Sequence, residues 1–173
     1  MQNLPTPLLA AGLLFVSWLA VRAYRRRWRR MRLVTIIDGD TFMAIDMRGK
    51  RRKLRLLGVD CPELNQKNGP QAKEFVQRVC GKQIVEVRLK GRDCYKRDLA
   101  DVRVGGQSLA LLLVREGLAY SLGGSVLLNM AAAGAWFKRR GVHRGFGQKK
   151  PWQASSRQPG LMRWLSYRLR KRR

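Results

Sequence analysis

The sequence has one histidine, His143, and no acidic residue outside its centre. With a single His in a basic stretch, histidine-based catalysis is not expected. All 11 Asp and Glu lie between Asp38 and Glu116, whereas 37 Lys and Arg give the chain a net charge of +26. The segment with the acids holds 17 of these cations, a net charge of +6, and the other 20 lie in flanks without any acid. Such flanks predict polyanionic partners, namely nucleic acid or anionic lipid.

Cysteine is also scarce. The three Cys, at positions 61, 80 and 94, are an odd number and form no C-x-x-C pair. Neither a zinc site nor a disulfide framework is indicated, and reduced thiols are expected, although one bridge remains open. Cys61 is favoured as a packed, inert residue over a reactive thiol.

One long apolar run is present, near the start of the chain. Leu8–Val21 is interrupted only by Ser17, and Leu4–Tyr24 gives 21 residues, about the length that spans a bilayer. Seven arginines follow within residues 22–32, which by the positive-inside rule keeps the rest of the chain cytoplasmic. We expect a single-pass membrane anchor over residues 1–24 and a basic juxtamembrane segment over 25–30. A signal sequence or an organelle-targeting leader is the alternative.

From residue 31 the pattern changes to short strands and helices, expected to form one domain over residues 31–145. Alternating and β-branched runs predict strands over residues 32–37, 41–47, 53–59, 83–89 and 99–104. Three strands joined by tight turns and followed by two more predict a five-stranded barrel of the OB type, a mainly β (α+β) fold. Helices are predicted from Gly69 to Gly81, over Leu109–Glu116 with Ser108 as the N-cap, and over Val126–Arg140.

The end of the chain, residues 146–173, is predicted to be a basic tail. Pro151–Gly160 is typical of a linker, and Leu161–Arg173 places Leu and Trp on one helical stripe among Lys and Arg. This pattern favours a basic amphipathic helix suited to a membrane surface or a nucleic-acid backbone. A solvated, disordered tail is the other interpretation.

Two acids and an arginine meet in Leu54–Glu63, L-R-L-L-G-V-D-C-P-E. The run predicts a strand that carries Arg55, is stopped by Pro62, and ends near Asp60 and Glu63. Carboxylates beside a core require a cation, and oxygen-rich sites suit Mg²⁺ or Ca²⁺ while arginine grips phosphate. The simpler interpretation is a salt-bridged strand end.

A second acidic turn, Asp38-Gly39-Asp40-Thr41, strengthens the metal and phosphate interpretation. Alone it is only a good turn sequence. Together with Asp60, Glu63 and two arginines it supplies what phosphodiester cleavage needs: a metal, a proton acceptor and guanidinium groups for the transition state's oxygens.

Five segments in order resemble the staphylococcal nuclease (thermonuclease) family. They are I-D-G-D-T at 37–41, L-R-L-L-G-V-D-C-P-E at 54–63, G-P-Q-A at 69–72, D-C-Y-K-R-D-L-A at 93–100 and L-V-R-E-G-L-A at 113–119. The resemblance covers about residues 32–120 and continues more weakly to about 143. It implies an OB-fold barrel with three helices and calcium-dependent hydrolysis of DNA and RNA that leaves 3′-phosphates.

The resemblance also implies roles for single residues. Asp40 and Asp60 correspond to the calcium-binding carboxylates, and Cys61 to the residue that offers calcium its backbone carbonyl. Glu63 corresponds to the residue taken as the general base, and Arg55 and Arg97 to the phosphate-binding pair. Asp38 is expected to support its own turn.

The sequence departs from the family pattern near the substrate. Five residues, L-N-Q-K-N, separate Glu63 from Gly69, a shorter loop than in the family's best-known member. The residues after Tyr120 are S-L-G-G-S, at a place where the family often has aromatic residues that stack on the base. Tyr95 or Tyr120 is therefore the alternative residue for base stacking. Lys96 stands where a small residue is common and adds a positive charge to the phosphate pocket.

Taken together, the sequence predicts a membrane-tethered, calcium-dependent endonuclease that acts on DNA or RNA and contacts anionic lipid through its basic arms. No obligate protein partner is evident. The alternative is a non-catalytic OB-fold module that binds nucleic acid at a membrane. A structural protein of the lipid surface is a third interpretation, but it leaves the acids and arginines unexplained.

Overall fold

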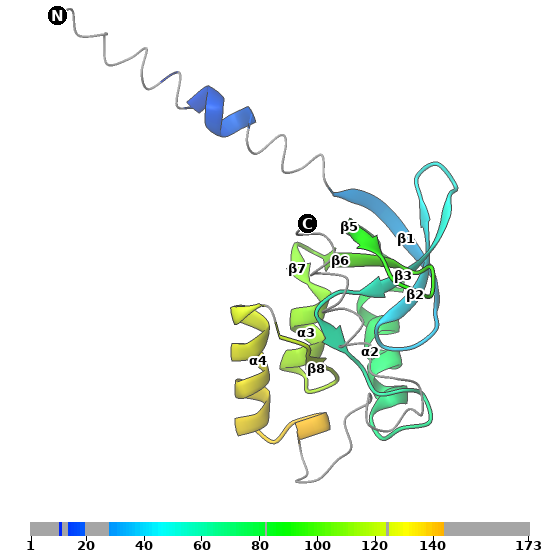
Figure 1. Cartoon of the computed structure of the whole chain (residues 1–173), viewed down its shortest axis with the longest axis vertical. Coiled ribbons are helices and arrows are strands. Elements are labelled where there is room, and N and C mark those ends of the chain that lie inside the picture. Colours follow the sequence, from blue (N-terminus) through cyan, green and yellow to red (C-terminus); the bar gives the residue numbers. More distant parts are fainter. Residues whose placement is uncertain (1–10, 12–13, 20–27, 82, 124, 144–173) are drawn as a thin grey trace, which may run out of the picture.

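The structure is a computed structural model that describes residues 11, 14–19, 28–81, 83–123 and 125–143. Its main body is a small β-barrel, with helices gathered below the strands in the view of Figure 1. The elements are β1 (Arg29–Ile36), β2 (Thr41–Asp46), β3 (Arg51–Leu56), β4 (Val59–Asp60), α2 (Gly69–Cys80), β5 (Ile84–Arg92), β6 (Asp98–Val104), β7 (Gln107–Ser108), α3 (Leu109–Arg115), β8 (Tyr120–Ser121), α4 (Val126–Phe137) and the 3₁₀ turn η1 (Gly141–His143).

Five strands close the barrel. They lie in the order β3-β2-β1-β5-β6, with antiparallel neighbours, and β3 returns to pair in parallel with β6 from Leu54–Asp98 to Leu56–Ala100. The short β7 extends the sheet beside β6. The predicted five-stranded barrel with helices is therefore confirmed.

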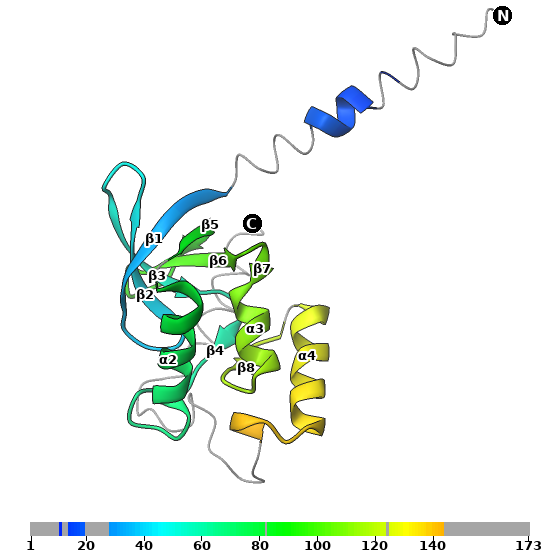
Figure 2. The ribbon, with the colours of Figure 1, turned by 180° about the vertical axis from the view of Figure 1, so that it is seen from behind.

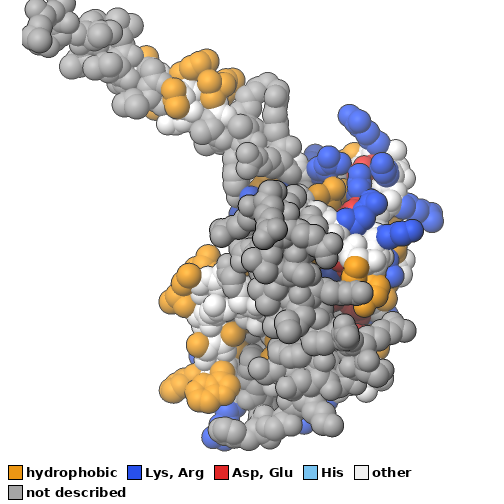
Figure 3. Space-filling model, in the orientation of Figure 1, with side chains coloured by type: hydrophobic (Ala, Val, Ile, Leu, Met, Phe, Trp, Pro, Cys, Tyr) orange, Lys and Arg blue, Asp and Glu red, His pale blue; other side chains and the backbone are white. Residues whose placement is uncertain are grey.

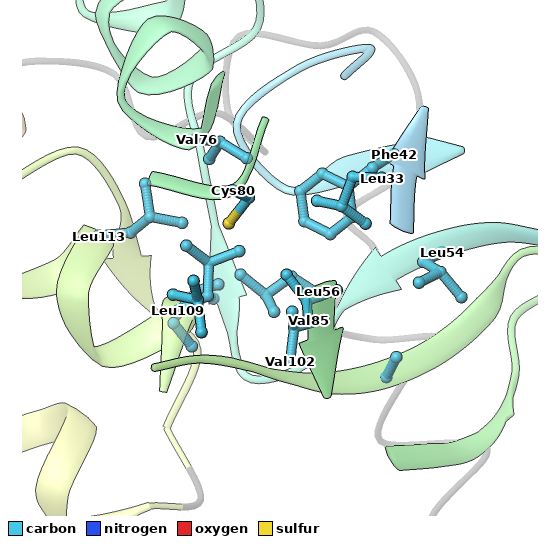
Figure 4. Close-up of a cluster of buried hydrophobic side chains, with 14 of the residues drawn as sticks. Leu33, Phe42, Leu54, Leu56, Val76, Cys80, Val85, Val102, Leu109 and Leu113 are labelled. Carbon is cyan, nitrogen blue, oxygen red and sulfur yellow. The ribbon is translucent and has the colours of Figure 1, made fainter. Parts of the chain in front are cut away.

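The core lies between the barrel wall and the helices. Alternate residues of β6, namely Asp98, Ala100, Val102 and Val104, are buried, as expected for a strand with one inward face. Leucine, valine and phenylalanine side chains from the strands meet others from α2 and α3 (Figure 4). The labelled members of this cluster are Leu33, Phe42, Leu54, Leu56, Val76, Cys80, Val85, Val102, Leu109 and Leu113.

The third predicted strand, residues 53–59, is broken in two. β3 ends at Leu56, Gly58 adopts the left-handed region with φ of +82°, and Val59 and Asp60 form the separate strand β4, which pairs with β8. Glycine enters this backbone region without steric cost, so the apolar run can turn at Gly58. The break moves Asp60 off the main sheet.

The first strand begins earlier than predicted. β1 starts at Arg29, inside the stretch expected to be juxtamembrane, because Arg29 and Arg30 pair with Val87 and Glu86 of β5. The guanidinium carbon of Arg88 lies 4.9 Å from the centroid of the Trp28 ring, and this cation–π contact stabilises the residue directly before β1.

The helices largely follow the predictions. α2 occupies Gly69–Cys80, and α3 starts after Ser108, whose Oγ accepts the N–H of Leu111 at 3.4 Å. α4 ends at Phe137 rather than at Arg140, because Arg139 takes φ of 47° and Gly141 φ of 48°, which a continuing helix does not allow.

Two predicted segments lie largely outside the described residues. Of the anchor over residues 1–24 only 11 and 14–19 are described, and the basic tail over 146–173 is not. Within the described residues, no helix has the length and apolar character to cross a membrane. Cys61 and Cys80 are buried free thiols, as expected.

Gly39 fixes how the Asp38–Thr41 turn meets α2. A Cβ at position 39 would lie 2.7 Å from the Cβ of Ala72 in α2 and 2.8 Å from the Sγ of Cys61. These atoms belong to buried residues, so they have little room to move. The turn can therefore seat on α2 only if its second residue has no side chain.

We expect Gly39→Ala to lower the free energy of unfolding by about 1–3 kcal/mol through overpacking. Gly134→Ala is the matched control, since a Cβ there meets nothing within 4 Å and the position lies in α4. It should raise the same quantity by about 0.5–1 kcal/mol. Urea unfolding followed by circular dichroism measures both, and equal effects of the two variants would contradict this packing.

Candidate functional site

The turn between β1 and β2 orients the first acid of the site. The Oδ1 of Asp38 accepts the backbone N–H of Asp40 at 2.9 Å and that of Thr41 at 2.6 Å. These bonds close the turn and direct the Asp40 side chain inward, where the residue is only 5% exposed. The expected supporting role of Asp38 is confirmed.

Arg55 joins two carboxylates that are distant in sequence. It lies opposite Thr41 in the β2–β3 ladder, and its Nη1 and Nη2 form ion pairs with Asp40 and Asp60, respectively. The backbone N–H of Cys61 donates to Oδ2 of Asp40 at 2.7 Å. The break at Gly58 thus brings β4 against the turn, and the three predicted residues Asp40, Asp60 and Arg55 meet in one cluster.

Arg97 reaches the same cluster through a hydroxyl. Its Nη1 donates to Oγ1 of Thr41 at 3.3 Å, and that hydroxyl donates to Oδ1 of Asp40 at 3.1 Å. Asp93 holds Arg97 in place by accepting its Nε–H at 2.7 Å and its backbone N–H at 2.9 Å. The guanidinium carbon also lies 5.3 Å from the ring centroid of the half-exposed Tyr95.

Sequence reasoning missed the roles of Thr41 and Asp93. The signals were present, since Thr41 directly follows the inward-facing Asp40 and Asp93 stands four residues before Arg97 in a turn. A pattern of acids and arginines alone does not say which neutral hydroxyl connects them.

Glu63 stands apart from the cluster, on the loop that leaves β4. Its backbone carbonyl accepts the N–H of Gln66 at 2.9 Å, and its own N–H donates to Oε1 of Gln66 at 3.0 Å. A Cβ at Gly69 would lie 1.9 Å from that carbonyl, so the loop closes tightly over the start of α2. The Glu63 side chain is exposed, and within the described residues its carboxylate forms no hydrogen bond or ion pair.

Burial dominates the electrostatics of the cluster. It raises the pKa of Asp40 from 3.8 to about 7 and outweighs the opposing effect of Arg55, while Asp38 and Asp60 push in the same direction as burial. Burial also raises the pKa of Asp60, again against the pull of Arg55. In their ionised forms the acids of the cluster, Asp38, Asp40, Asp60 and Asp93, outnumber its two arginines, Arg55 and Arg97.

This surplus fits a bound cation. Among the described residues no group of three His, Cys, Asp or Glu forms a complete ligand set, but Asp40 and Asp60 offer hard carboxylate oxygens of the kind that calcium prefers. Burial raises the pKa of the Cys61 thiol well above 9.0, and calcium prefers oxygen to sulfur, so the backbone carbonyl is the ligand that Cys61 can offer to calcium.

Comparison with known proteins agrees with this geometry. Residues 53–125 match the family model described as "Staphylococcal nuclease homologue". The chain is 32% identical over 108 residues to an "Uncharacterized endonuclease" of Haemophilus influenzae, covering 62% of this chain and 61% of the relative. It is 35% identical over 96 residues to a "Thermonuclease" of Staphylococcus hyicus, covering 51% and 56% of the two chains. The match thus spans between half and two thirds of the length of these relatives.

The raised pKa values predict that the metal-free protein loses stability as pH rises. Between pH 3.8 and about 7 the folded Asp40 keeps a proton that the unfolded chain has released, so raising the pH favours unfolding. The free energy of unfolding should fall with a slope approaching about 1.4 kcal/mol per pH unit. The pKa values of Asp46 and Asp98 are lowered in the folded protein, so these two residues make the free energy of unfolding rise with pH. They do so only at pH values below the ordinary pKa of an aspartate.

Urea unfolding in EDTA at a series of pH values measures this slope. Asp40→Asn removes the titrating group while it mimics the protonated carboxyl, and it should flatten the profile. A profile that keeps its slope in this variant would assign the pH dependence to other groups.

Proposed function

Because the barrel of this chain belongs to the staphylococcal nuclease family, we propose that the chain is a metal-dependent endonuclease that hydrolyses phosphodiester bonds of DNA or RNA. The observation that carries the proposal is the convergence of Asp40, Asp60 and Arg55, with Arg97 linked to them through Thr41. Buried acids with a charge surplus and guanidinium groups at one place are suited to phosphate chemistry.

The arginines bind the scissile phosphate. Arg97 is half-buried and held by Asp93, so its guanidinium is oriented before the substrate arrives. Arg55 is held between two acids and offers the phosphate oxygens a charge whose position is fixed. Fixed cations stabilise the charge that develops in the transition state without reorganising at that moment.

The metal site and the base complete the proposal. Asp40 and Asp60 hold calcium through their carboxylates, and Cys61 does so through its backbone carbonyl. Calcium, when bound, supplies positive charge that polarises the phosphate. Glu63 accepts the proton of the attacking water, for which its exposed carboxylate on a short, closed loop is suited.

A non-catalytic module that only binds nucleic acid is the alternative. It would have no use for the buried Asp40 beside the half-buried Asp60, an arrangement that is costly for two acids. The complete set of acids and arginines favours catalysis.

We expect the full chain to cleave single-stranded and duplex DNA with calcium and to be inactive in EDTA. Glu63→Gln should lower the rate by about 10²–10⁴-fold through loss of the proton acceptor. Arg97→Ala should lower it by about 10²–10³-fold through loss of transition-state stabilisation. Initial rates on a labelled oligonucleotide, with calcium, magnesium or EDTA, measure these effects.

Two surface variants serve as controls. Glu74→Gln and Arg78→Ala change exposed residues of the same types in α2 and should keep wild-type rates. If the wild-type chain binds DNA but cleaves none with either metal, the protein is a binding module instead.

A membrane tether is the second part of the proposal. The apolar stretch Leu4–Tyr24 and the arginines after it support a single-pass anchor with the nuclease domain on the cytoplasmic side. The basic arms add attraction for anionic lipid headgroups. Tethering confines the enzyme to nucleic acid that comes near the membrane.

In a bacterial host, we expect the chain to stay with membranes after alkaline carbonate washing. Val16→Arg should release it into the soluble fraction, because an arginine at the centre of a spanning helix costs about 2.5–3.5 kcal/mol. Val34→Arg, at an exposed valine of β1, should stay with the membranes. Protease should digest the domain in inside-out vesicles and spare it in spheroplasts; the reverse pattern would contradict the topology.

A further inference from the structure

The outer face of α4 is apolar along its whole length. Leu128 and Ala135 point inward and are buried, whereas the side chains on the opposite face are largely exposed. These exposed side chains are Val126 (74%), Leu127 (67%), Met130 (67%) and Phe137 (83%). Met130 and Phe137 lie four and eleven residues after Val126, so these three share one stripe of the helix, and Leu127 lies at the edge of that stripe.

The fold does not account for this stripe. α4 packs on α3 and β8 and lies outside α3, away from the barrel, in both ribbon views (Figures 1 and 2). Hydrophobic side chains gather over α4 in the space-filling view (Figure 3). A helix that only covers a core normally carries polar residues on its outer face, so a continuous apolar stripe indicates a partner.

Positive charge lies at one end of the stripe. Lys138, Arg139 and Arg140 follow α4 directly and are exposed, and α4 itself contains no acid; Arg140 forms an ion pair with Glu116 at 3.6 Å. Phe137 ends the apolar stripe and, with the exposed Trp136, lies directly before these cations. An apolar face, then aromatic rings, then cations is the order of groups at the boundary of an anionic membrane.

We propose that the outer face of α4 inserts shallowly into an anionic lipid surface. Charge complementarity favours this occupant. A second copy of the chain, with a net charge of +26, or the acid-free tail after residue 143 would bring more positive charge beside Lys138, Arg139 and Arg140. Lipid offers hydrocarbon for the stripe and phosphate for the three cations.

This contact is separate from catalysis and from the N-terminal anchor. α4 lies on the far side of α3 from β2 and β3 (Figure 1), and it meets the cluster only indirectly, through β8, which pairs with β4. Lipid on α4 therefore leaves the cluster open to nucleic acid and fixes which side of the domain faces away from the bilayer.

The test measures the environment of α4 in the full chain. In a Cys94→Ser background, Met130→Cys and Met47→Cys are labelled with an environment-sensitive fluorophore; both methionines are 67% exposed, and Met47 lies in the β2–β3 hairpin. We expect a blue shift and a severalfold rise in emission at position 130 with vesicles of phosphatidylglycerol and phosphatidylcholine. Lipid-borne quenchers should reverse the rise, and position 47 should not respond.

A second variant tests the stripe itself. Phe137→Lys should abolish the response of the label at position 130, whereas Val34→Lys, on β1, should leave it unchanged. No response to anionic vesicles, or an equal response at position 47, would overturn the proposal. The proposal would also fail if the label at position 130 were shielded from water in the absence of lipid. Shielding that appears only at high protein concentration would indicate a second copy of the chain. Shielding that is lost when residues 144–173 are removed would indicate the tail.

Discussion

The ion pairs of Arg55 with Asp40 and Asp60 are the constraint on which the rest of the structure depends. A buried guanidinium is costly unless its partners are all present, and removing one partner of such a set is strongly destabilising. The pairs therefore tie three parts of the chain together: the turn before β2, the end of β3 and the separate strand β4. The groups that fix this end of the barrel are the same groups that hold the metal and the phosphate in the proposed reaction.

The cluster is also where stability and function oppose each other. Burial raises the pKa of Asp40 to about 7, so its charged form is disfavoured in the folded protein. The negative charge of Asp38 raises the pKa of Asp40 further, while the same Asp38 side chain closes the turn through two backbone hydrogen bonds. In the proposed enzyme a bound cation would offset this unfavourable burial of charge, so the site would be kept ready at a cost to the stability of the fold.

The two proposals divide the molecule into a side for nucleic acid and a side for lipid. The acid–arginine cluster lies on the strands, and α4 presents its apolar stripe and three following cations on the far side of α3. The acid-free flanks add positive charge that suits either polyanion. Positive charge attracts nucleic acid and anionic lipid alike, so charge alone does not assign a surface to either. The exposed apolar residues of α4 favour lipid for that surface.

The sequence by itself determined the order of strands and helices, the Ser108 cap, the Asp38 turn and the residue types of the site. These are local, because turn residues, caps and side-chain periodicity act over a few positions. Only the tertiary structure decided that the run after Leu56 breaks at Gly58, that Thr41 connects Arg97 to Asp40, and that the described residues leave one apolar face of α4 uncovered. The physical reason is that each depends on partners far along the chain, such as β6 beside β3 and β8 beside β4, and periodicity shows which residues share a face but not what that face meets.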